Sequence, residues 1–336
     1  MPNIMLTYKC NLKCPYCFAN EFVNQDTHDI TEEKFDMAVT FLTKDGAAHF
    51  GLIGGEPTLH PQFSGFLEKI IKNPLIKEVT IYTNGILLDK YIKLIVNPKF
   101  RLLVNCNAPS LIGESKYKKL CNNLDILIKE YYMKERINLG YNFYSDDAEY
   151  EYIIELLKRY DLHRVRLTWT VPNFLKEETI NAINFFKERK NALLNLLQRF
   201  DENTILPYYD CNLPPWCVWT EDEKKWLQEY VEKYKVKESN LIDNRSVCYP
   251  VIDILPDLTA VRCFGMSCFE KIYINDFKTI TDIASYFINH IDAEAYRISA
   301  CDDCLDCYER KIRHCTCGCI GFKQGEIFKL NKQLSF

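Results

Sequence analysis

Hydrophobic and polar residues alternate in blocks along the first half of the chain, and the blocks switch between two periods. Short apolar runs typical of buried strands occur at residues 4–8, 48–53, 78–83, 101–107, 137–143 and 165–170. Apolar residues spaced three or four apart, as on one face of a helix, occur at residues 31–44, 61–72, 89–95, 115–131 and 149–160. Thr31, followed by Glu32 and Glu33, is a suitable N-cap for the first of these helices. Strands that alternate with helices in this way predict a parallel sheet covered by helices.

The pattern changes after Pro172. Helical spacing is found at residues 177–199 and 221–234, on either side of a stretch rich in proline and aromatic residues at 208–217. Two short apolar runs, 251–255 and 260–263, enclose Pro256 and Asp257 and indicate a hairpin. We therefore expect an α/β fold with three segments: a (β/α) domain at 1–172, a mainly helical connecting segment at 173–247 and a cysteine-rich domain at 248–336.

Composition narrows the class of protein. A net charge of −4 in 336 residues argues against a general attraction to nucleic acid or to an anionic membrane surface. No apolar run approaches the roughly 18 residues of a transmembrane helix. The first nine residues lack the charged and apolar regions of a signal peptide, so we expect a cytoplasmic protein. Disulfides are disfavoured in that compartment, and closely spaced cysteines among the 16 therefore indicate metal binding or catalysis.

Three of these cysteines, Cys10, Cys14 and Cys17, follow the first predicted strand with the spacing C-x3-C-x2-C. Three thiolates can hold three corners of a four-iron cluster and leave the fourth iron open for chemistry. The alternative is a chance grouping in a cysteine-rich chain. Cys106 and Cys121 lie alone in apolar patterns, and we interpret them as small buried side chains.

Other polar and glycine residues stand where later strands end. Gly54-Gly55-Glu56-Pro57 follows the second strand, residues 83–85 end the third, and Asn105 and Asn107 end the fourth. The carboxyl ends of parallel strands share one rim, so these residues should lie near the first cysteines. The glycines permit close approach of the backbone to a ligand, and Glu56 can accept hydrogen bonds from an ammonium group. A plain strand–helix turn is the alternative for the Gly-Gly-Glu sequence alone.

On these motifs, residues 3–172 resemble the radical SAM superfamily. The resemblance implies a partial (β/α)6 TIM-like barrel and a 4Fe–4S cluster held by Cys10, Cys14 and Cys17. S-adenosylmethionine (SAM) would bind the open iron and be cleaved to a 5′-deoxyadenosyl radical that takes a hydrogen atom from the substrate. A flavodoxin or ferredoxin is the implied electron donor. The residues that the resemblance assigns to cofactor binding are Tyr16, Gly54, Gly55, Glu56, Pro57, Thr83, Asn84, Asn105 and Asn107.

The C-terminal part resembles the SPASM and twitch extensions of this superfamily, which carry one or two auxiliary 4Fe–4S clusters. Nine cysteines are candidate ligands, one of them in excess of two clusters: Cys248, Cys263, Cys268, Cys301, Cys304, Cys307, Cys315, Cys317 and Cys319. Residues 301, 304, 315 and 319 match the family pattern C-x2-C…C-x3-C, although the gap from 304 to 315 is longer than in the family. Zinc is the main alternative to iron–sulfur clusters for such cysteine pairs.

Cys211 and Cys217 form a C-x5-C pair in the aromatic stretch. Either can be an auxiliary cluster ligand, a thiol that donates a hydrogen atom to a substrate radical, or a structural residue. The six histidines show no metal-ligand spacing, and we interpret His60 and His163 as surface or loop residues.

The SPASM-like extension favours a peptide or protein substrate, with a crosslink, an epimerisation or an oxidation as the outcome. Few residues precede Cys10, so we expect a peptide to be held by the barrel mouth, by residues 173–247 or by a separate partner. One alternative is a radical dehydrogenase or carbon-skeleton enzyme acting on a small metabolite. Another is a non-enzymatic iron–sulfur or zinc protein used for electron transfer or binding.

Overall fold

The computed structural model describes residues 1–17, 19, 23–24, 28–46, 48–170, 181–234, 240–242, 247–267, 270–299 and 301–323. The chain divides into two compact units, each built from two separate stretches. The first unit is Met1–Gly140 with Pro250–Tyr286, and the second is Tyr141–Tyr249 with Phe287–Phe336. The two units are defined by which residues pack together. The three segments expected from the sequence are defined by the motifs that each contains. The three-segment division stays a prediction.

A sheet forms the centre of the first unit. Its strands are β1 (Asn3–Met5), β2 (Ala48–Ile53), β3 (Ile76–Thr83), β4 (Phe100–Asn105), β8 (Asp253–Ile254), β9 (Thr259–Val261) and β10 (Ile272–Tyr273). They pair in the order β10-β9-β8-β1-β2-β3-β4, and the first residues of β5 (Ile137–Phe143) pair with β4. The strands β8, β1, β2, β3, β4 and β5 run parallel, while β9 and β10 are antiparallel additions. The parallel α/β arrangement is the one that the sequence pattern predicts.

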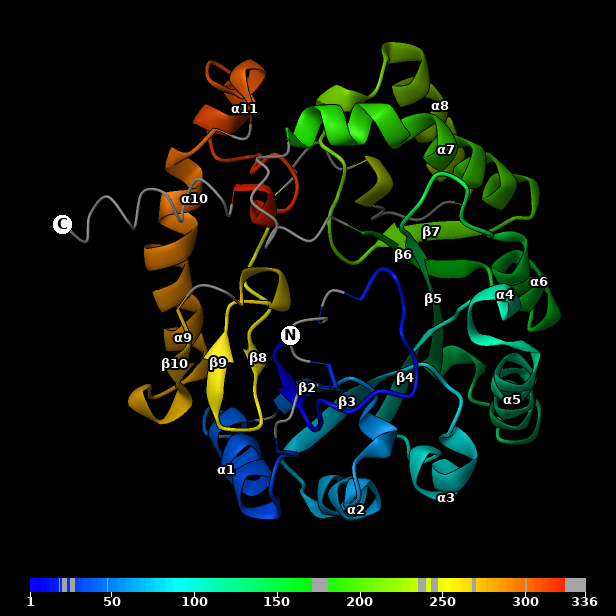
Figure 1. The fold of residues 1–336 in the computed structure, drawn as a ribbon, viewed down its shortest axis with the longest axis vertical. Helices are drawn as coiled ribbons and strands as arrows, with labels where there is room; N and C mark the ends of the chain where they lie inside the picture. The colour runs from blue at the N-terminus through cyan, green and yellow to red at the C-terminus, as the bar shows by residue number, and fades with distance from the viewer. Residues whose placement is uncertain are drawn as a thin grey trace. The chain divides into compact units, whose positions relative to one another are not determined.

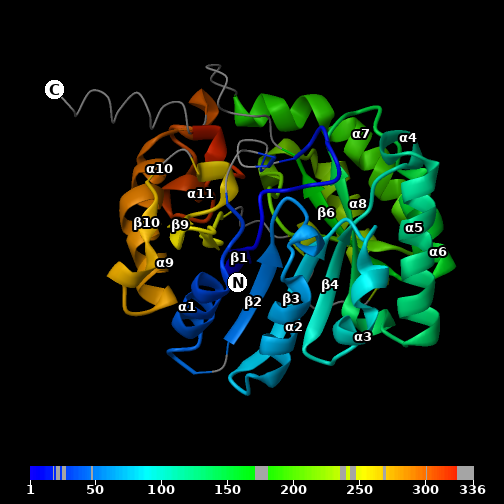
Figure 2. The ribbon, with the colours of Figure 1, turned by 60° about the horizontal axis from the view of Figure 1, so that its bottom comes forward.

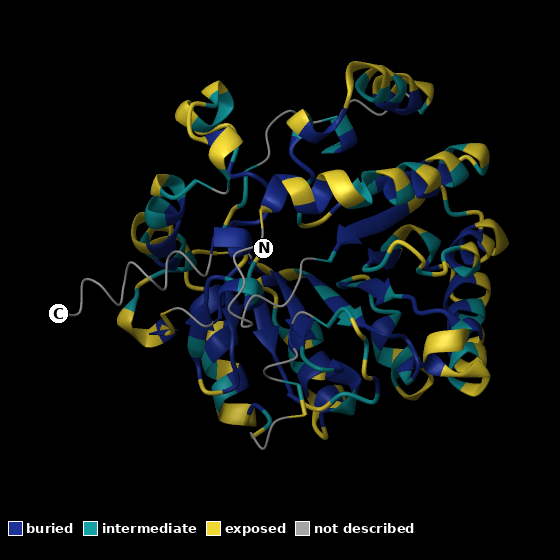
Figure 3. Ribbon diagram, turned by 45° about the horizontal axis from the view of Figure 1, so that its top comes forward, coloured by how far each residue is buried: buried dark blue, intermediate teal, exposed yellow. Residues whose placement is uncertain are grey.

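Helices cover the outer face of these strands, with α1, α2 and α3 alongside β2, β3 and β4 (Figures 1 and 2). The α-helices in the described part of the first unit are α1 (Glu32–Leu42), α2 (Phe63–Lys72), α3 (Ile92–Ile95), α4 (Pro109–Ile112), α5 (Glu114–Asp125) and all but the last residue of α9 (Ile280–Phe287). Thr31 caps α1 as expected, because its side chain accepts a hydrogen bond from the Lys34 backbone N–H. Phe35 of α1 stacks on Phe66 of α2, with ring centroids 4.1 Å apart. Figure 3 shows the result, with buried strands and with exposed residues on the outer sides of the helices.

The hairpin at β8 and β9 confirms the expected turn at Pro256 and Asp257, and it also extends the sheet beside β1. Asn3 pairs with Asp253, 250 positions later, and its side-chain Nδ2 donates to Asp253 Oδ1 at 2.7 Å. Beyond β1, Tyr8 packs in a cluster that includes Val261 and Phe264. The sequence assigned residues 251–263 to a separate cysteine-rich domain, and the structure places them in the unit that carries the first cysteines.

The second unit holds the end of β5, together with β6 (Arg164–Trp169) and β7 (Leu206–Tyr209), which pair in parallel. Its helices are α6 (Glu151–Arg159), α7 (Ala182–Glu202), α8 (Glu221–Lys233), α10 (Ala293–Arg297) and α11 (Tyr308–Lys311), and α9 (Ile280–Phe287) ends at its border. Trp169 is buried at the end of β6 and packs edge-on against Phe186 of α7, which in turn contacts Phe322. This aromatic core brings the C-terminal residues of the unit onto α7.

Candidate radical SAM site

The loop that carries Cys10, Cys14 and Cys17 begins directly after β1. All three thiols are free and partly buried. The loop turns back on itself, since Leu12 N donates to Cys10 Sγ at 3.4 Å and Cys17 N donates to Cys14 O at 3.2 Å. Leu12 packs with Ile86 into a small apolar cluster to which Cys10 and Cys14 are adjacent. The structure thus confirms the prediction that the three cysteines lie on a loop directly after the first strand.

Gly54 and Gly55 hold this loop against the end of β2. Gly55 N donates to Thr7 O at 2.9 Å, and Glu56 N donates to Lys9 O at 2.8 Å. A Cβ added at Gly55 would lie 2.4 Å from Lys9 O, and one at Gly54 would lie 2.7 Å from Thr7 O. The glycines therefore permit a close approach of the chain to its own backbone immediately before Cys10. A role in binding the cofactor remains a prediction for both.

Glu56 is the centre of a buried hydrogen-bond network at the strand ends. Its Oε1 accepts from Thr58 N at 3.3 Å, from Thr58 Oγ1 at 2.6 Å and from Thr83 Oγ1 at 2.7 Å, and its Oε2 accepts from Asn84 N at 2.7 Å. Burial raises the pKa of this carboxyl, and the hydrogen bonds oppose the rise. Pro57 follows as the first residue of a short 3₁₀ helix that Glu56 caps. Since a carboxylate offers about four acceptor positions, Oε2 retains room for one more donor, as the expected ammonium contact requires.

Asn84 connects this network to the cysteine loop. Its Nδ2 donates to Asn11 Oδ1 at 2.7 Å, and Lys116 Nζ donates to the backbone oxygen of Asn11 at 3.2 Å. Asn11 lies between the first two cysteines and was not singled out in the sequence. Its place inside the motif is the signal that would have identified it.

Tyr16 and Asn107 meet on the other side of the loop. The Tyr16 hydroxyl donates to Asn107 Oδ1 at 2.5 Å, and the same oxygen lies 3.8 Å from Cys14 Sγ. Asn107 is buried, and its Nδ2 donates to Asn105 O at 3.5 Å. The structure therefore brings the end of β4 to the cysteine loop, as the shared rim predicts. The individual contacts of Tyr16, Asn105 and Asn107 with a cofactor stay predictions.

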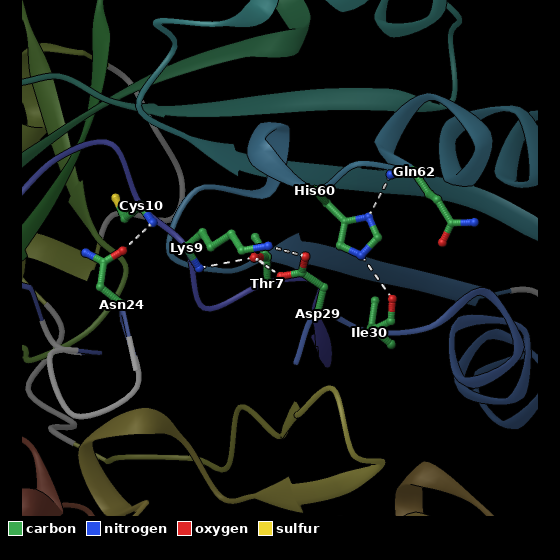
Figure 4. A network of polar contacts seen from close by, with 8 residues as sticks. All are labelled: Thr7, Lys9, Cys10, Asn24, Asp29, Ile30, His60 and Gln62. Carbon is green, nitrogen blue, oxygen red and sulfur yellow. Dashed lines mark hydrogen bonds and ion pairs between the residues drawn. The ribbon is translucent and has the colours of Figure 1, made fainter. Parts of the chain in front are cut away.

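Figure 4 shows a second polar network, which fixes the residues before Cys10. Asp29 accepts from Thr7 Oγ1 and from Lys9 Nζ, each at 2.6 Å, and Asn24 Oδ1 accepts from Cys10 N at 3.0 Å. Burial alone would raise the pKa of Asp29, but the hydrogen bonds from Lys9 and Thr7 outweigh it and lower the pKa. Asp29 is therefore ionised at neutral pH and anchors the start of the loop. Nothing in the sequence pattern distinguishes it from other loop carboxylates.

His60 lies in the loop after the short 3₁₀ helix Pro57–Leu59, which is one of the two placements predicted for it, but it is buried and not at the surface. Its Nδ1 accepts from Gln62 N at 3.0 Å, so Nε2 carries the proton and donates to Ile30 O at 3.0 Å. Burial lowers the pKa of the imidazole, which keeps it neutral. The ring thus links the chain after Glu56 to the segment that enters α1. His163 is exposed, as expected.

The three thiols fit a four-iron cluster by their chemistry. Burial raises the pKa of each, that of Cys10 to about 11, and the negative charge of Glu56 adds to the rise at Cys10. They are neutral at pH 7 until a metal displaces their protons. Among the residues that the structure describes, no group of three or more His, Cys, Asp or Glu side chains is arranged to bind a single metal ion. A four-iron core binds its thiolates at separate irons and does not need that convergence.

The second unit gathers most of the C-terminal cysteines. Cys304 Sγ lies 3.4 Å from Cys301 Sγ and 3.7 Å from Cys317 Sγ, and Cys315 Sγ accepts from Cys317 N at 3.1 Å. Cys248 adjoins the same loop, since its N–H donates to Thr316 Oγ1 at 3.2 Å.

The remaining candidate ligands are in different parts of the chain. Cys319 Sγ accepts from Gly321 N within the second unit. Cys263 belongs to the first unit, where it precedes Phe264. Cys268 lies outside the described residues.

Cys211 and Cys217 are both exposed but have different neighbours. Desolvation of the Cys217 thiol raises its pKa to about 11, and the charges of Cys315, Cys304 and Cys307 add to the effect. Cys211 Sγ donates to Asn212 Oδ1 at 3.5 Å. The sequence suggests the two cysteines as a pair, and in the structure the C-terminal thiols act electrostatically on Cys217.

These features indicate an iron–sulfur enzyme. A loop with three cysteines follows the first strand of a parallel α/β sheet, and a Gly-Gly-Glu-Pro turn follows the second. The radical SAM superfamily model matches residues 4–186, more than half of the chain, and the protein belongs to this superfamily. Its members are enzymes that use a 4Fe–4S cluster and SAM.

Curated relatives match parts of the chain. GTP 3′,8-cyclase of Alkaliphilus metalliredigens is 27% identical over 139 residues, which are 41% of this chain and 43% of the relative. A probable GTP 3′,8-cyclase of Methanococcus maripaludis is 26% identical over 249 residues, 73% of each chain. The match to the Alkaliphilus enzyme thus spans less than half of that enzyme's length.

Among solved structures, the chain is similar to Streptococcus suis SuiB bound to S-adenosylmethionine, with a TM-score of 0.56 and 14% identity over 98% of this chain and 71% of SuiB. SuiB bound to its precursor peptide SuiA gives a TM-score of 0.52 and 18% identity over 84% of this chain and 63% of SuiB. These similarities confirm the expected fold class, a partial (β/α)6 barrel followed by a cysteine-rich region. No helix in the described part of the chain has the length and apolar character needed to span a membrane.

Proposed function

We propose that this radical SAM enzyme abstracts a hydrogen atom from a side chain or an α-carbon of a peptide or protein. The observation that carries the proposal is the gathering of cysteines in the second unit, where Cys301, Cys304 and Cys317 are in sulfur contact. Cysteines gathered in this way are candidate metal ligands, and the SPASM-like extension, which carries auxiliary iron–sulfur clusters, accompanies peptide-modifying members of the superfamily. The likeness of the fold to SuiB, which was solved with a precursor peptide, agrees with this proposal.

In this proposal, Cys10, Cys14 and Cys17 hold three irons of the first cluster. The bound cluster and SAM supply the 5′-deoxyadenosyl radical. The chain positions the cofactor: Gly54, Gly55 and Pro57 shape the turn, and Glu56 with Thr83 and Asn84 fixes the strand ends around it. Tyr16, Asn105 and Asn107 are the proposed contacts of the adenosyl part. The peptide or protein substrate and a flavodoxin or ferredoxin electron donor are the proposed partners, and the cytoplasm is the proposed location.

A second candidate is a radical reaction on a small metabolite such as a nucleotide. The curated relatives favour it, because those reported above are GTP 3′,8-cyclases. The two matches reported above are 26–27% identical, and one of them covers less than half of the relative. We therefore place it second.

An anaerobic assay separates the two candidates. Reconstituted, reduced protein is incubated with SAM and either a peptide library or GTP, and 5′-deoxyadenosine and product masses are measured. A mass change localised on peptide residues supports the first candidate, and conversion of GTP with inert peptides supports the second. Absence of 5′-deoxyadenosine from well-loaded protein contradicts both.

A triple variant tests the role of the first cysteines. Replacing Cys10, Cys14 and Cys17 by alanine should abolish 5′-deoxyadenosine formation and leave iron bound at the C-terminal cysteines. Cys121→Ala is a matched control, since this buried cysteine of α5 is not among the expected cluster ligands and should leave SAM cleavage unchanged. A triple variant without any iron or sulfide would contradict the auxiliary-cluster part of the proposal.

A further inference from the structure

Three buried polar side chains of the second unit lie near the ends of β5 and β6. They are Asn142, Arg166 and Thr168, and each is more than nine-tenths buried. Tyr141 of β5 packs against α6, and Trp169 of β6 packs against α7. Side chains alternate between the two faces of a strand, so the three polar groups are on the face opposite to these helices. In a barrel, that face is the interior.

The pairing of β5 with β6 places Asn142 beside Thr168. Thr170 N donates to Phe143 O at 2.9 Å, and the rings of Phe143 and Trp169 are in edge contact, with centroids 5.3 Å apart. In a parallel ladder this hydrogen bond makes Phe143 the neighbour of Trp169. The residues one position earlier on each strand, Asn142 and Thr168, are therefore also neighbours and share one face.

Two buried atoms of this pair, Asn142 Nδ2 and Thr168 Oγ1, have no hydrogen-bond partner in the described part of the chain. The orientation of the Asn142 amide is fixed, because its Oδ1 accepts from Arg166 Nη1 at 3.2 Å. Exchanging Oδ1 and Nδ2 would set a donor against the guanidinium, so Nδ2 is the atom left without a partner. Such atoms cost stability, and native proteins keep few of them. Two on neighbouring strands indicate a ligand.

The charges around the pair favour an uncharged ligand. Arg166 Nε donates to Asp210 Oδ2 at 3.1 Å, and Asp210 directly follows β7. This carboxylate balances the guanidinium, which leaves no net positive charge to attract a phosphate or a carboxylate. Asn142 Nδ2 can only donate, and the Thr168 hydroxyl can donate as well. A carbonyl oxygen has two lone pairs and can accept both hydrogen bonds.

The cofactor motifs leave the ends of β5 and β6 unassigned. The proposed contacts of the first cluster and of SAM come from the loops after β1 and β2 and from the ends of β3 and β4. In parallel barrels, the ends of different strands contribute to the binding of different ligands. The ends of β5 and β6 are therefore available for the substrate.

We propose that Asn142 Nδ2 and Thr168 Oγ1 donate hydrogen bonds to one amide carbonyl oxygen of the peptide substrate. The inference rests on the proposed function and specifies how its substrate is held. Both atoms are shielded from solvent, so the peptide displaces the side chains that cover them when it binds. A peptide held at one carbonyl presents only the positions near that carbonyl to the radical.

Thermal unfolding tests whether the hydroxyl lacks a partner in the protein without substrate. Reconstituted Thr168→Val protein should melt at or above the temperature of wild type, because the change removes a buried group that makes no hydrogen bond. Thr43→Val is the matched control, since Thr43 is equally buried but its Oγ1 donates to Val39 O at 2.9 Å. The control should melt about 1–2 °C lower. An equal loss in Thr168→Val would overturn the proposal.

Binding is tested with N-acetylglycine N-methylamide, a small molecule that contains two peptide groups. The methyl resonance of Thr168 is followed by NMR in reconstituted protein with labelled threonine, and it should shift saturably. Asn142→Asp keeps the acceptor for Arg166, removes the donor and should weaken binding at least about fivefold. Asn138→Asp, on an exposed position of β5, is the control and should leave the affinity unchanged.

Three other probes distinguish this ligand from its alternatives. Acetate, GTP and SAM are each added to the same labelled protein. A preferred response to acetate would make the site an anion site, one to GTP would assign it to a nucleotide, and one to SAM would assign it to the cofactor. Each of these results, or no saturable shift with the peptide analogue, would overturn the proposal.

The reaction itself separates this proposal from the proposed function. With a peptide that is modified in the anaerobic assay, Asn142→Asp should raise the peptide concentration for half-maximal rate at least about fivefold, with a smaller effect on the rate at saturation. If every peptide stays unmodified, the proposed function fails. If a peptide is modified with the same concentration dependence in wild type and Asn142→Asp, only the carbonyl site fails.

Discussion

Glu56 shows how one buried side chain can organise a site before any ligand arrives. Its four hydrogen bonds join the end of β2, the turn at Thr58 and the end of β3 at Thr83 and Asn84. Through Asn84 the same network reaches Asn11 in the cysteine loop. A contact with the SAM ammonium group would therefore act on a carboxylate that is already fixed in place.

Replacing Glu56 by glutamine should lower the free energy of unfolding by about 1–3 kcal/mol. The amide nitrogen cannot accept a hydrogen bond, so at least one buried donor among Thr58, Thr83 and Asn84 loses its acceptor. Urea unfolding of the cluster-free protein measures the effect. Glu155→Gln, on an exposed position of α6, is the control and should stay within about 0.5 kcal/mol of wild type. Equal stabilities of the two variants would show that the network contributes little.

Asp253 gives the stability a defined pH dependence. It is fully buried between Asn3 and Phe264 N, and burial raises its pKa from 3.8 to about 6. Between these two values the folded protein keeps a proton that the unfolded chain has released. The free energy of unfolding should therefore fall as the pH rises from about 4 to 6, by roughly 3 kcal/mol from this group. Asp253→Asn should remove this part of the slope in urea unfolding curves, and identical slopes would contradict it.

At the scale of elements, the site depends on the close pairing of the turn after β2 with the residues after β1. Gly55→Ala would place a methyl group 2.4 Å from Lys9 O, which is backbone and cannot move aside alone. We expect a loss of about 2 kcal/mol or more in unfolding free energy and weaker retention of iron at the first cluster. Gly65→Ala in α2 is the matched control, because its methyl group would meet no atom within 4 Å and should stabilise the helix. Normal iron retention in Gly55→Ala would show that the pairing does not position the loop.

The elements near the site were predictable because each carries a local signal. Apolar runs fixed β2 and β5, and Thr31 fixed the start of α1. The strand β7 was missed because Leu206-Pro-Tyr-Tyr contains a proline and reads as part of an aromatic loop. The predicted helix over residues 115–131 is divided into α5 and a π-helical turn, Ile126–Glu130, which leaves no mark on the apolar spacing.

The residues of the site were predictable only where they belong to a motif. The cysteines, Gly54 to Pro57 and Asn107 stand at strand ends and could be named. Asn24, Asp29 and His60 make contacts with residues of other segments. No motif in the sequence around them predicts these contacts. The burial of Lys323 could not be predicted from the sequence, because it depends on the packing of the second unit.

For the whole molecule, the main consequence is that the first unit is discontinuous. The hairpin of β8 and β9 completes the sheet beside β1, although more than 200 residues separate the two in the chain. The residues with the SAM motifs and a stretch assigned to the cysteine-rich extension therefore form one packed body. A division of the protein at residue 172 or 247 would cut that body.

Truncated chains should reveal this dependence. A chain that ends at residue 249 lacks the Ile252 oxygen that accepts from Asn3 N, and it exposes the side of Tyr8 that packs on Val261 and Phe264. It should aggregate, or exchange the amide hydrogens of β1 at least about tenfold faster than the full chain. A chain that ends at residue 286 keeps both stretches of the first unit and is the matched control, since both truncations lack residues 287–336. Hydrogen exchange and sedimentation measure the two effects. Slow exchange in β1 of the shorter chain would mean that residues 1–249 build the sheet without the hairpin, because only the presence of residues 250–286 differs between the two.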